Sequence, residues 1–386
     1  MEIISRFALA LTLACLMGCG QQSTESTTES APVSTAPTKV IVYNWEEYIE
    51  PAVLDAFTNE TGIVVDYQTF VSNDDLQALL DAGEPFADVV VPSAIPYGRQ
   101  QVQRRQLRAL PADLKMALPE FDANIARALK RADASGNFLV PYMWGTTGIG
   151  YNVDLVRAAL GPDVALDSWK LLFDPEYTSK LKDCGIAIQA EKAEIIAAAT
   201  IAYDVSAMDS PLTEYVLSRT LAPTLPDILY FSGSSRIIED LATGKICIAL
   251  AWSGDVQQAV DRAEEASTGQ NIAYVLPKEG ALIWVDTMAV PANAPNPDGA
   301  AKFIEFILRP QNLAQISNFV AYASPLPAAD AFVDEEILSN PTIYPSASDR
   351  ERLYSVPGTS ERNRAARDKA FDELVGASDK WQPDAE

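Results

Sequence analysis

The chain of 386 residues contains no histidine. Histidine is the side chain whose charge changes near neutral pH, and it is both the usual general base of enzymes and a frequent zinc ligand. Its absence excludes triads built around histidine and most types of zinc site. We expect a protein that is not an enzyme, has no catalytic residues and holds neither a metal nor a cofactor.

Positive charge is scarce as well. The chain has 29 lysines and arginines against 53 aspartates and glutamates, which gives a formal net charge of −24. Such a balance argues against nucleic acid and against anionic membrane surfaces as partners. It permits a cationic ligand without demonstrating one, because acidic surfaces also serve solubility.

Long hydrophobic runs are lacking after the first residues, since nothing there approaches the ~18 apolar residues of a membrane helix. At the start, Arg6 and the apolar segment 7–17 have the pattern of a secretory signal peptide. We therefore expect a signal peptide over 1–18 and a periplasmic protein.

The signal ends in Leu16-Met17-Gly18-Cys19, which resembles the lipobox of bacterial lipoproteins. The resemblance implies that Cys19 becomes the lipidated first residue, so that the protein touches the membrane only through that lipid. An ordinary cleaved signal is the alternative. Residues 19–38 are rich in Ser, Thr, Gln, Glu and Pro and have no aromatic residue, which predicts a flexible tether.

Cysteine is used only four times. Cys15 is lost with the signal and Cys19 would carry the lipid, so Cys184 and Cys247 remain. In an oxidising compartment an isolated pair is most simply a disulfide. Two buried free thiols are the alternative.

The roughly 350 remaining residues exceed what one hydrophobic core usually serves, so we expect two lobes. We predict an α/β fold with a first lobe formed by 39–143 plus 287–335, and a second formed by 144–286 plus 336–386. The glycine-containing segment 138–152 reads as a strand that crosses between the lobes, with 285–291 crossing back. A plain edge hairpin is the alternative for 138–152.

The stretch 39–67 is the clearest structural unit. A β-branched run at 39–43 predicts a buried strand, Pro51 fits a first helical turn, Thr61-Gly62 ends that helix, and 63–67 predicts a second strand. Open α/β sheets bind ligands beyond the carboxyl ends of their strands. The loop after the first strand, with two aromatic and two acidic residues at 45–48, is therefore a candidate site.

Further strands are expected at 86–91, 185–188 and 246–252, and at 272–276 and 281–285 with a turn between the last two. Helices are expected at 191–202 and 300–308, the second ended by Pro310. The residues at strand ends are Trp45, Glu46, Glu47, Tyr48, Ser93, Trp252, Asp255, Trp284, Asp286 and, in a late loop, Tyr322.

Every charged residue of this set is a carboxylate. A cleft for anions would need arginines or exposed helix-end amides, whereas acids between aromatic faces suit ammonium groups joined by carbon chains. Each residue also has a structural alternative: a lone tryptophan can pack in the core, and Asp255 can cap a helix over 256–263.

The motifs YNWEEYI, ETGI, VVVPSA, PYMWGTTGIGYN, AWSGD, PKEGALIWVD, AVPANAPN and FILRP resemble those of the putrescine- and spermidine-binding receptors of bacterial ABC importers. The resemblance runs from about Lys39 to near Arg367. It implies a periplasmic-binding-protein fold of the second type, monomeric, whose two lobes close over a polyamine and deliver it to the importer's membrane subunits.

The resemblance also implies roles for single residues. Trp45 and Tyr48 would be aromatic walls, Glu47 the carboxylate of the first loop and Ser93 a polar wall. The other implied ligand contacts are Glu194, Trp252, Asp255, Trp284, Asp286 and Tyr322. Cys184 and Cys247 match the putrescine-type members, which supports the disulfide.

The ligand itself stays open. Glu47 and Trp284 are of spermidine type, Asp255 is of putrescine type, and Glu46 adds a carboxylate where a small hydroxyl residue is usual. Putrescine, spermidine or both would fit. Other readings are a receptor that senses polyamine without transport, a sugar or metal receptor of the same fold, and a glycosidase with paired acids.

Overall fold

The computed structural model describes residues 39–208, 212–357, 361–376 and 378–383. The predicted signal peptide, the lipidated Cys19 and the tether all lie outside the described residues. Within the described residues, no helix combines the length and the hydropathy needed to cross a membrane.

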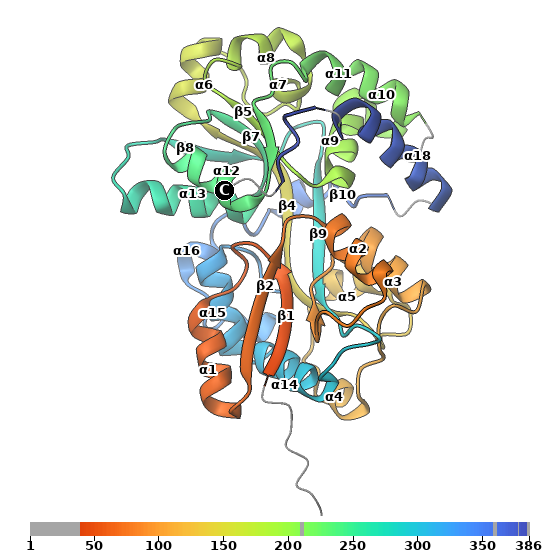
Figure 1. Cartoon of the computed structure of the whole chain (residues 1–386). Helices are drawn as coiled ribbons and strands as arrows, with labels where there is room; N and C mark the ends of the chain where they lie inside the picture. The colour runs from red at the N-terminus through yellow and green to blue at the C-terminus, as the bar shows by residue number, and fades with distance from the viewer. Residues whose placement is uncertain (1–38, 209–211, 358–360, 377, 384–386) are drawn as a thin grey trace, which may run out of the picture. The chain divides into compact units, whose positions relative to one another are not determined.

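The first lobe contains a parallel sheet in the order β2-β1-β3. Figure 1 shows β1 beside β2. Its strands are β1 (Lys39–Trp45), β2 (Val64–Phe70) and β3 (Val89–Val90). Its helices are α1 (Pro51–Thr61), α2 (Asn73–Ala82), η1 (Ala94–Gly98), α3 (Arg99–Gln103), α4 (Ala112–Ala117), α5 (Ala123–Ala132), α14 (Pro297–Ile307), α15 (Pro310–Val320) and η3 (Pro327–Ala329).

The predicted strand–helix–strand unit is confirmed. Pro51 begins α1, and Gly62 ends it with a positive φ of 73°, a conformation that glycine adopts without steric cost. β3 is shorter than the predicted 86–91, and just before it the Asp88 carboxylate accepts the backbone N–H of Ile41 at 2.8 Å.

The second lobe contains a mixed sheet in the order β10-β9-β4-β7-β5-β6, with β8 also paired to β4. Its strands are β4 (Val140–Asn152), β5 (Ile186–Gln189), β6 (Tyr230–Ser232), β7 (Ile248–Trp252), β8 (Ile272–Val275), β9 (Ala281–Met288) and β10 (Leu353–Tyr354). Its longer helices are α6 (Val153–Leu160), α8 (Pro175–Leu181), α9 (Lys192–Asp204), α10 (Thr213–Arg219), α12 (Ser234–Ala242), α13 (Ser253–Glu265) and α18 (Glu361–Phe371).

Shorter helical segments complete the chain. They are α7 (Lys170–Phe173), η2 (Val205–Ala207), α11 (Leu221–Thr224), α16 (Glu335–Leu338), α17 (Ala347–Arg350) and η4 (Asp372–Gly376).

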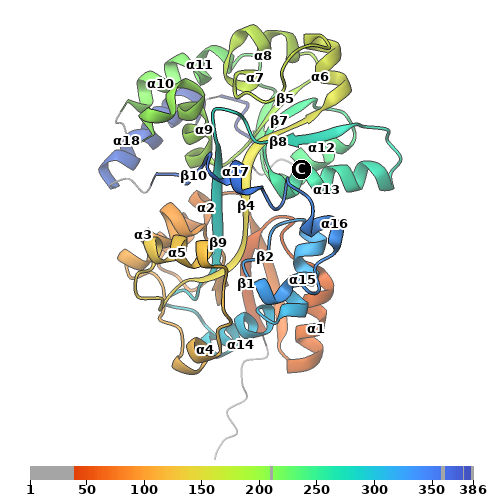
Figure 2. The same cartoon turned by 180° about the vertical axis from the view of Figure 1, so that it is seen from behind.

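β4 and β9 run side by side from the first lobe into the second, as Figures 1 and 2 show. They are antiparallel from Val140 opposite Met288 to Thr147 opposite Leu282, and beyond this β4 pairs with β7 and β8. The edge-hairpin alternative for 138–152 is therefore wrong. The predicted two-lobed α/β fold is confirmed, whereas the lobe boundaries stay a prediction.

Three local expectations need correction. β8 and β9 do not form the predicted hairpin with each other, because both pair with β4. Pro310 does not only follow the helix that ends at Ile307 but also begins α15, where its fixed φ suits the first turn. Asp255 lies in the first turn of α13 and not at its N-cap, which is Trp252.

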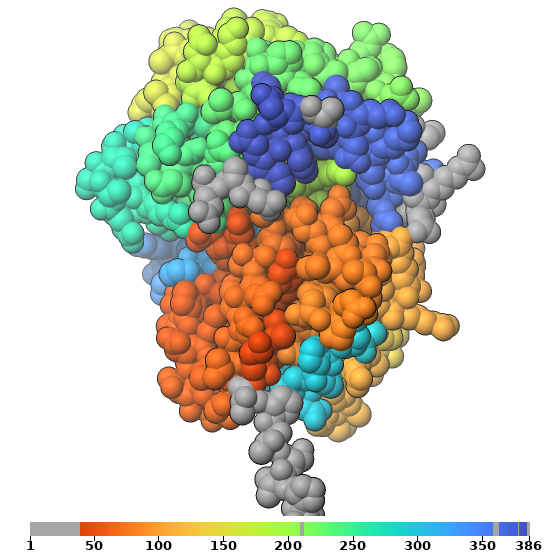
Figure 3. All heavy atoms as spheres, viewed as in Figure 1, coloured from red at the N-terminus to blue at the C-terminus, as the bar shows by residue number. Residues whose placement is uncertain are grey.

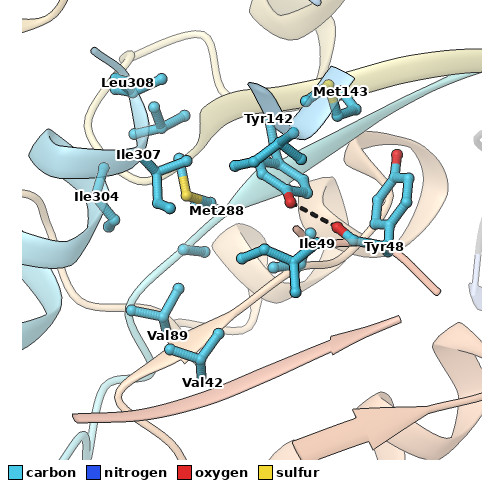
Figure 4. Close-up of a cluster of buried hydrophobic side chains, with 14 of the residues drawn as sticks. Val42, Tyr48, Ile49, Val89, Tyr142, Met143, Met288, Ile304, Ile307 and Leu308 are labelled. Atoms are coloured by element: carbon cyan, nitrogen blue, oxygen red, sulfur yellow. Dashed lines mark hydrogen bonds between the residues drawn. The ribbon is translucent and has the colours of Figure 1, made fainter. Parts of the chain in front are cut away.

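Each lobe has its own core. In the first, residues of β1 and β3 pack with residues of β4, β9 and α14, and Figure 4 shows part of this cluster around Val42, Val89 and Met288. The Tyr142 hydroxyl of β4 donates to the backbone carbonyl of Tyr48 at 2.6 Å, which anchors the loop after β1. This loop belongs to the candidate site.

The second core is centred on β5 and β7. Cys184, after α8, and Cys247, before β7, are joined by a disulfide, which confirms the prediction. In the space-filling view the red and orange atoms of the first lobe abut the green and blue atoms of the second (Figure 3).

Candidate binding site

One cavity collects residues from strand ends of both lobes. We call it the front cavity. It is lined by Trp45, Glu46, Tyr48, Ser93, Glu194, Trp252, Asp255, Trp284, Asp286 and Tyr322. Its volume is about 10 Å³, roughly the space of one water molecule, so the side chains close it almost completely.

Aromatic rings form most of the wall. The Trp284 and Tyr322 ring centroids lie 5.3 Å apart, those of Tyr48 and Tyr322 5.1 Å apart, and those of Trp45 and Trp252 5.2 Å apart. These tilted and edge-to-face pairs are the arrangements that aromatic rings prefer. The tryptophans are buried as core residues would be, yet they also line the cavity.

Glycines make room for these rings. A Cβ added to Gly254 would lie 2.5 Å from the Tyr322 ring, and one added to Gly145 would lie 2.7 Å from the Trp284 ring. The glycine of AWSGD and the first glycine of the MWGTTG run are thus needed for close approach. The close approach of the Trp284 ring therefore explains Gly145, whose φ is not positive.

Asp286 lies on β9 at the bottom of the front cavity. Its carboxylate accepts hydrogen bonds from the Ser93 hydroxyl at 2.7 Å and from the Tyr48 hydroxyl at 3.0 Å. Burial raises the pKa of Asp286 to about 7, and the nearby charge of Glu194 acts in the same direction.

Asp255 faces the cavity from the first turn of α13. One carboxylate oxygen accepts from the Tyr322 hydroxyl at 2.6 Å, while the other, Oδ2, is buried and has no hydrogen-bond partner among the described residues. Burial raises the pKa of Asp255 to about 7. A buried carboxylate oxygen without a donor is costly, so this atom is suited to meet a donor brought by a ligand.

Glu194 comes from the first turn of α9. It accepts from the Thr147 hydroxyl at 2.6 Å and from the Trp252 indole N–H at 2.8 Å. Burial raises the pKa of Glu194 to about 7, and the charge of Asp255 adds to the shift.

The three acids share one electrostatic property. Within the described part of the chain, none of Glu194, Asp255 and Asp286 forms an ion pair with a lysine or arginine. Their donors are hydroxyl and indole groups, which leave the negative charge uncompensated. The arrangement favours either protons or a cation that enters from outside.

Glu47 departs from its predicted place. It has a positive φ of 51°, and its side chain lies outside the front cavity. Its carboxylate accepts from the Arg262 guanidinium at 2.7 Å and from the Ser235 hydroxyl at 3.2 Å, both on helices of the second lobe. Glu47 thus joins the lobes, and its role as the carboxylate of the first loop stays a prediction.

Glu46 does line the cavity. Its Oε2 accepts the backbone N–H of Ser235 at 3.4 Å, at the start of α12. The two neighbouring glutamates therefore have different surroundings, with only Glu46 beside the three buried acids.

Asn73 and Glu191 were missed from the sequence. The Asn73 side chain donates to the Ser93 hydroxyl at 3.1 Å and accepts the Ser93 N–H at 3.1 Å, and Glu191 accepts the Asn73 N–H at 3.0 Å. Asn73 is the first residue of α2, and no strand-end pattern marks it. Glu191 follows the end of β5, so the strand-end rule would have found it.

No cluster of three or more metal-ligand side chains occurs among the residues described, so the cavity offers no evident metal centre. Its chemistry is that of acids held apart among indole and phenol rings.

Comparisons with known proteins place this geometry in a family. The sequence profile of the bacterial extracellular solute-binding proteins matches residues 52–345. The chain is 41% identical over 323 residues to the putrescine-binding periplasmic protein PotF of Escherichia coli, covering 82% of this chain and 85% of PotF. It is 37% identical over 342 residues to the putrescine-binding periplasmic protein SpuD of Pseudomonas aeruginosa, covering 88% and 92%.

A solved structure agrees with these relatives. It is described as a putative spermidine/putrescine ABC transporter from Listeria monocytogenes, and it superposes with a TM-score of 0.76 at 27% identity. The superposition covers 87% of this chain and 98% of that one.

Proposed function

Because the chain belongs to the bacterial extracellular solute-binding proteins, we propose that it is a receptor that binds a polyamine and delivers it to an ABC importer. The relatives named for putrescine support the ligand class. The observation that carries the proposal is the front cavity, where three buried carboxylates that pair with no lysine or arginine of the described residues lie among aromatic rings.

The ligand would lie extended between the acids. One ammonium group would bind Asp286 beside Trp284 and Tyr48. A second would bind Oδ2 of Asp255, the oxygen that has no hydrogen-bond partner among the described residues. Glu194 interacts electrostatically with both carboxylates and would add to the attraction for the cation. The intervening methylenes would contact the ring faces. Putrescine and spermidine both carry ammonium groups joined by methylene chains, and Glu46 also lines the cavity.

Magnitudes support a tight complex. Removing water from an ammonium group costs several kcal/mol, so each nitrogen needs paired acceptors. A charge-assisted hydrogen bond returns about 1.5–3 kcal/mol, contact of a cation with a ring about 0.5–2, and each buried methylene about 0.8. After the cost of association, a micromolar or tighter dissociation constant, about −8 kcal/mol, is expected.

Entry of a ligand would require the cleft to open. The closed cavity holds roughly one water, so the rings and the two lobes must separate before a polyamine enters. A ligand that contacts Tyr48 and Ser93 of the first lobe as well as Asp255 of the second favours the closed form, because only there are both sets of residues in contact with it. The importer would recognise this closed surface.

The proposal includes a location. The receptor would act in the periplasm as a monomer, held to the membrane by a lipid on Cys19, with lobes formed by 39–143 plus 287–335 and by 144–286 plus 336–386. The periplasmic relatives support the compartment.

Calorimetric titration with putrescine, cadaverine, spermidine and spermine tests the proposal. We expect at least one of putrescine and spermidine to bind with a micromolar or tighter constant, weakening as salt is raised. If none of the four binds, while a neutral sugar or a metal ion does, the proposal is wrong.

A further inference from the structure

A second cavity lies behind β9. Side chains alternate along a strand, so Ile283 and Val285 point away from the face that carries Asp286. The Trp284 side chain lines both this cavity and the front cavity. Ile283 and Val285 line a cavity of about 420 Å³, which we call the rear cavity. It is far larger than the front cavity, at about 10 Å³ by the same measure.

Both lobes contribute walls to the rear cavity. One wall is α5, which packs in the first core through Ile125, and another is the segment from Arg350 to Ser355, whose Tyr354 packs against the second core. Figure 2 shows α5, α17 and β10 at different heights along β4 and β9. A molecule in this cavity would therefore contact both lobes and the strands that connect them.

Three arginines surround the rear cavity, in contrast to the acids of the front one. Arg127 and Arg131 lie one turn apart on α5, and Arg350 ends α17. None of the three forms an ion pair with a carboxylate of residues 39–208, 212–357, 361–376 or 378–383. In a chain with a net charge of −24, three such cations around one cavity are unusual.

The few contacts of these arginines leave most donors free to bind a ligand. Arg127 reaches Asn124 of its own helix at 3.4 Å, and Arg350 donates to the Pro345 carbonyl at 2.8 Å. The lining acid Asp122 is occupied as the N-cap of α5, accepting two backbone N–H groups at 2.8 and 3.1 Å. It does not pair with the arginines.

The remaining surface is apolar and aromatic. The Arg350 guanidinium stands 5.3 Å from the ring centroid of Trp144, and Ile283, Val285 and Ile125 complete the floor. Guanidinium forks match carboxylate and sulfonate oxygens, and an apolar floor suits a hydrocarbon body. The volume lies within the ~300–1,000 Å³ typical of small-molecule sites.

We propose that the rear cavity binds a small organic anion, a carboxylate or sulfonate on an aromatic or aliphatic body. Arg127, Arg131 and Arg350 hold the anionic group, and the back of β9 receives the body.

The position of the site implies coupling to the front cavity. The lobes are joined across the cleft by Glu47 with Arg262, and by Asn73 with Glu191. A rotation about β4 and β9 that breaks these contacts would move α5 toward the segment from Arg350 to Ser355 and narrow the rear cavity. An anion that fills it opposes this rotation and strengthens ligand binding at the front.

The probe for the test is 1-anilinonaphthalene-8-sulfonate, with N-phenyl-1-naphthylamine as the same aromatic body without charge. We expect the sulfonate to bind the full protein at one saturable site. The double variant Arg127→Ala/Arg131→Ala should bind it at least tenfold more weakly. Lys130→Ala removes a neighbouring cation of α5 that does not line the cavity, so it should leave the affinity for the sulfonate unchanged. Neither variant should change the affinity for the uncharged dye.

Both variants change exposed side chains, so thermal melting should show that they are folded. Equal affinity of the sulfonate for the double variant and the wild type, or no saturable binding to the wild type, overturns the proposal.

A competition experiment separates the two cavities. Saturating putrescine should leave the sulfonate bound and raise its affinity, and the sulfonate should raise putrescine affinity by the same factor. Displacement of the dye by putrescine would place it in the front cavity and refute the rear site. If putrescine does not bind at all, the function proposed above fails, while the dye titration still decides the rear site.

Discussion

Asp286, Asp255 and Glu194 are each buried, and the hydrogen bonds that they accept come from uncharged side chains. At the scale of the residue, this is why the front cavity selects cations. Aromatic rings alone would accept any apolar chain, whereas the positions of the acids fix how many nitrogens a ligand needs and how far apart they lie.

Asp286→Asn tests this selection. The amide keeps the size of the side chain and an acceptor for Ser93 or Tyr48, but it removes the charge that holds an ammonium group. We expect polyamine affinity to fall at least tenfold, about 1.4 kcal/mol, while the melting temperature of the ligand-free protein near pH 7 is no lower than that of wild type, because the variant lacks a buried group that must ionise. Calorimetry and thermal melting measure both, and Asp55→Asn on the exposed face of α1 is the control. Unchanged affinity would contradict the role of Asp286.

The residues at strand ends could be predicted because the carboxyl ends of strands bring distant segments together. Trp45, Trp252 and Asp286 were found in this way, and all the proposed ligand contacts except Glu47 line the front cavity. Glu47 could not be placed, because its ion-pair partner Arg262 lies on α13, 215 residues further along the chain.

At the scale of elements, the contact of Glu47 with Arg262 is a bridge between the loop after β1 and α13. The two side chains are 30% and 35% exposed, and partly exposed ion pairs contribute only about 0–1 kcal/mol. The bridge therefore makes only a small contribution to the stability of the closed form and does not by itself hold the lobes together.

Glu47→Gln separates this bridge from ligand binding. We expect it to change polyamine affinity by no more than about threefold. The ion pair contributes up to ~1 kcal/mol and affects binding only by stabilising the closed form. Arg262→Gln, which removes the other partner of the same bridge, should have a similar effect. A loss of tenfold or more with Glu47→Gln but not with Arg262→Gln would show that Glu47 contacts the ligand directly.

The disulfide is the second feature at this scale. It joins Cys184 and Cys247, 63 residues apart, and lies away from the residues that line the front cavity. We expect the double variant Cys184→Ala/Cys247→Ala to lose about 2–4 kcal/mol of stability, because a cross-link restricts the unfolded chain. Denaturant unfolding measures the loss. Polyamine affinity should be unchanged, and a protein as stable as wild type would contradict the expectation.

Helix caps and strand patterns were predictable because they depend on neighbouring residues. Pro51 begins α1 and Gly62 ends it, as the sequence predicts. Strand partners were less predictable. The turn at 277–280 suggests a hairpin of β8 with β9. Instead, β4 is long enough to pair with both strands, and each of them pairs with β4.

At the scale of the whole molecule, the buried acids make stability depend on pH. Their pKa values of about 7 lie above the ordinary values of 3.8 and 4.5, so the folded state binds more protons than the unfolded state between these limits. Their contribution to stability is fully present below about pH 4 and is lost as pH rises through about 7.

We therefore expect this contribution to fall between pH 5 and pH 8 in the ligand-free protein. Asp286→Asn removes one of the three groups and should make the fall smaller. Denaturant unfolding of both proteins at the two pH values measures the difference, and an equal or steeper fall in the variant would contradict the assignment of a raised pKa to Asp286.

The lobes, the crossing strands and the cleft were predicted from chain length and from motifs in family order. The closed state of the cleft and the rear cavity were not, because they depend on how packed side chains from both lobes meet. Val285, for example, is recognisable in the sequence only as a strand residue. In the structure it lines the rear cavity together with residues of α5 and Arg350.

The most direct measurement is calorimetric titration of putrescine near pH 7 in buffers with different ionisation enthalpies. If the cation binds the buried carboxylates, it lowers their pKa values, and protons should be released to the buffer on binding, with less release from Asp286→Asn. Binding with no proton release, or with proton uptake, would contradict the claim that these acids hold the ligand.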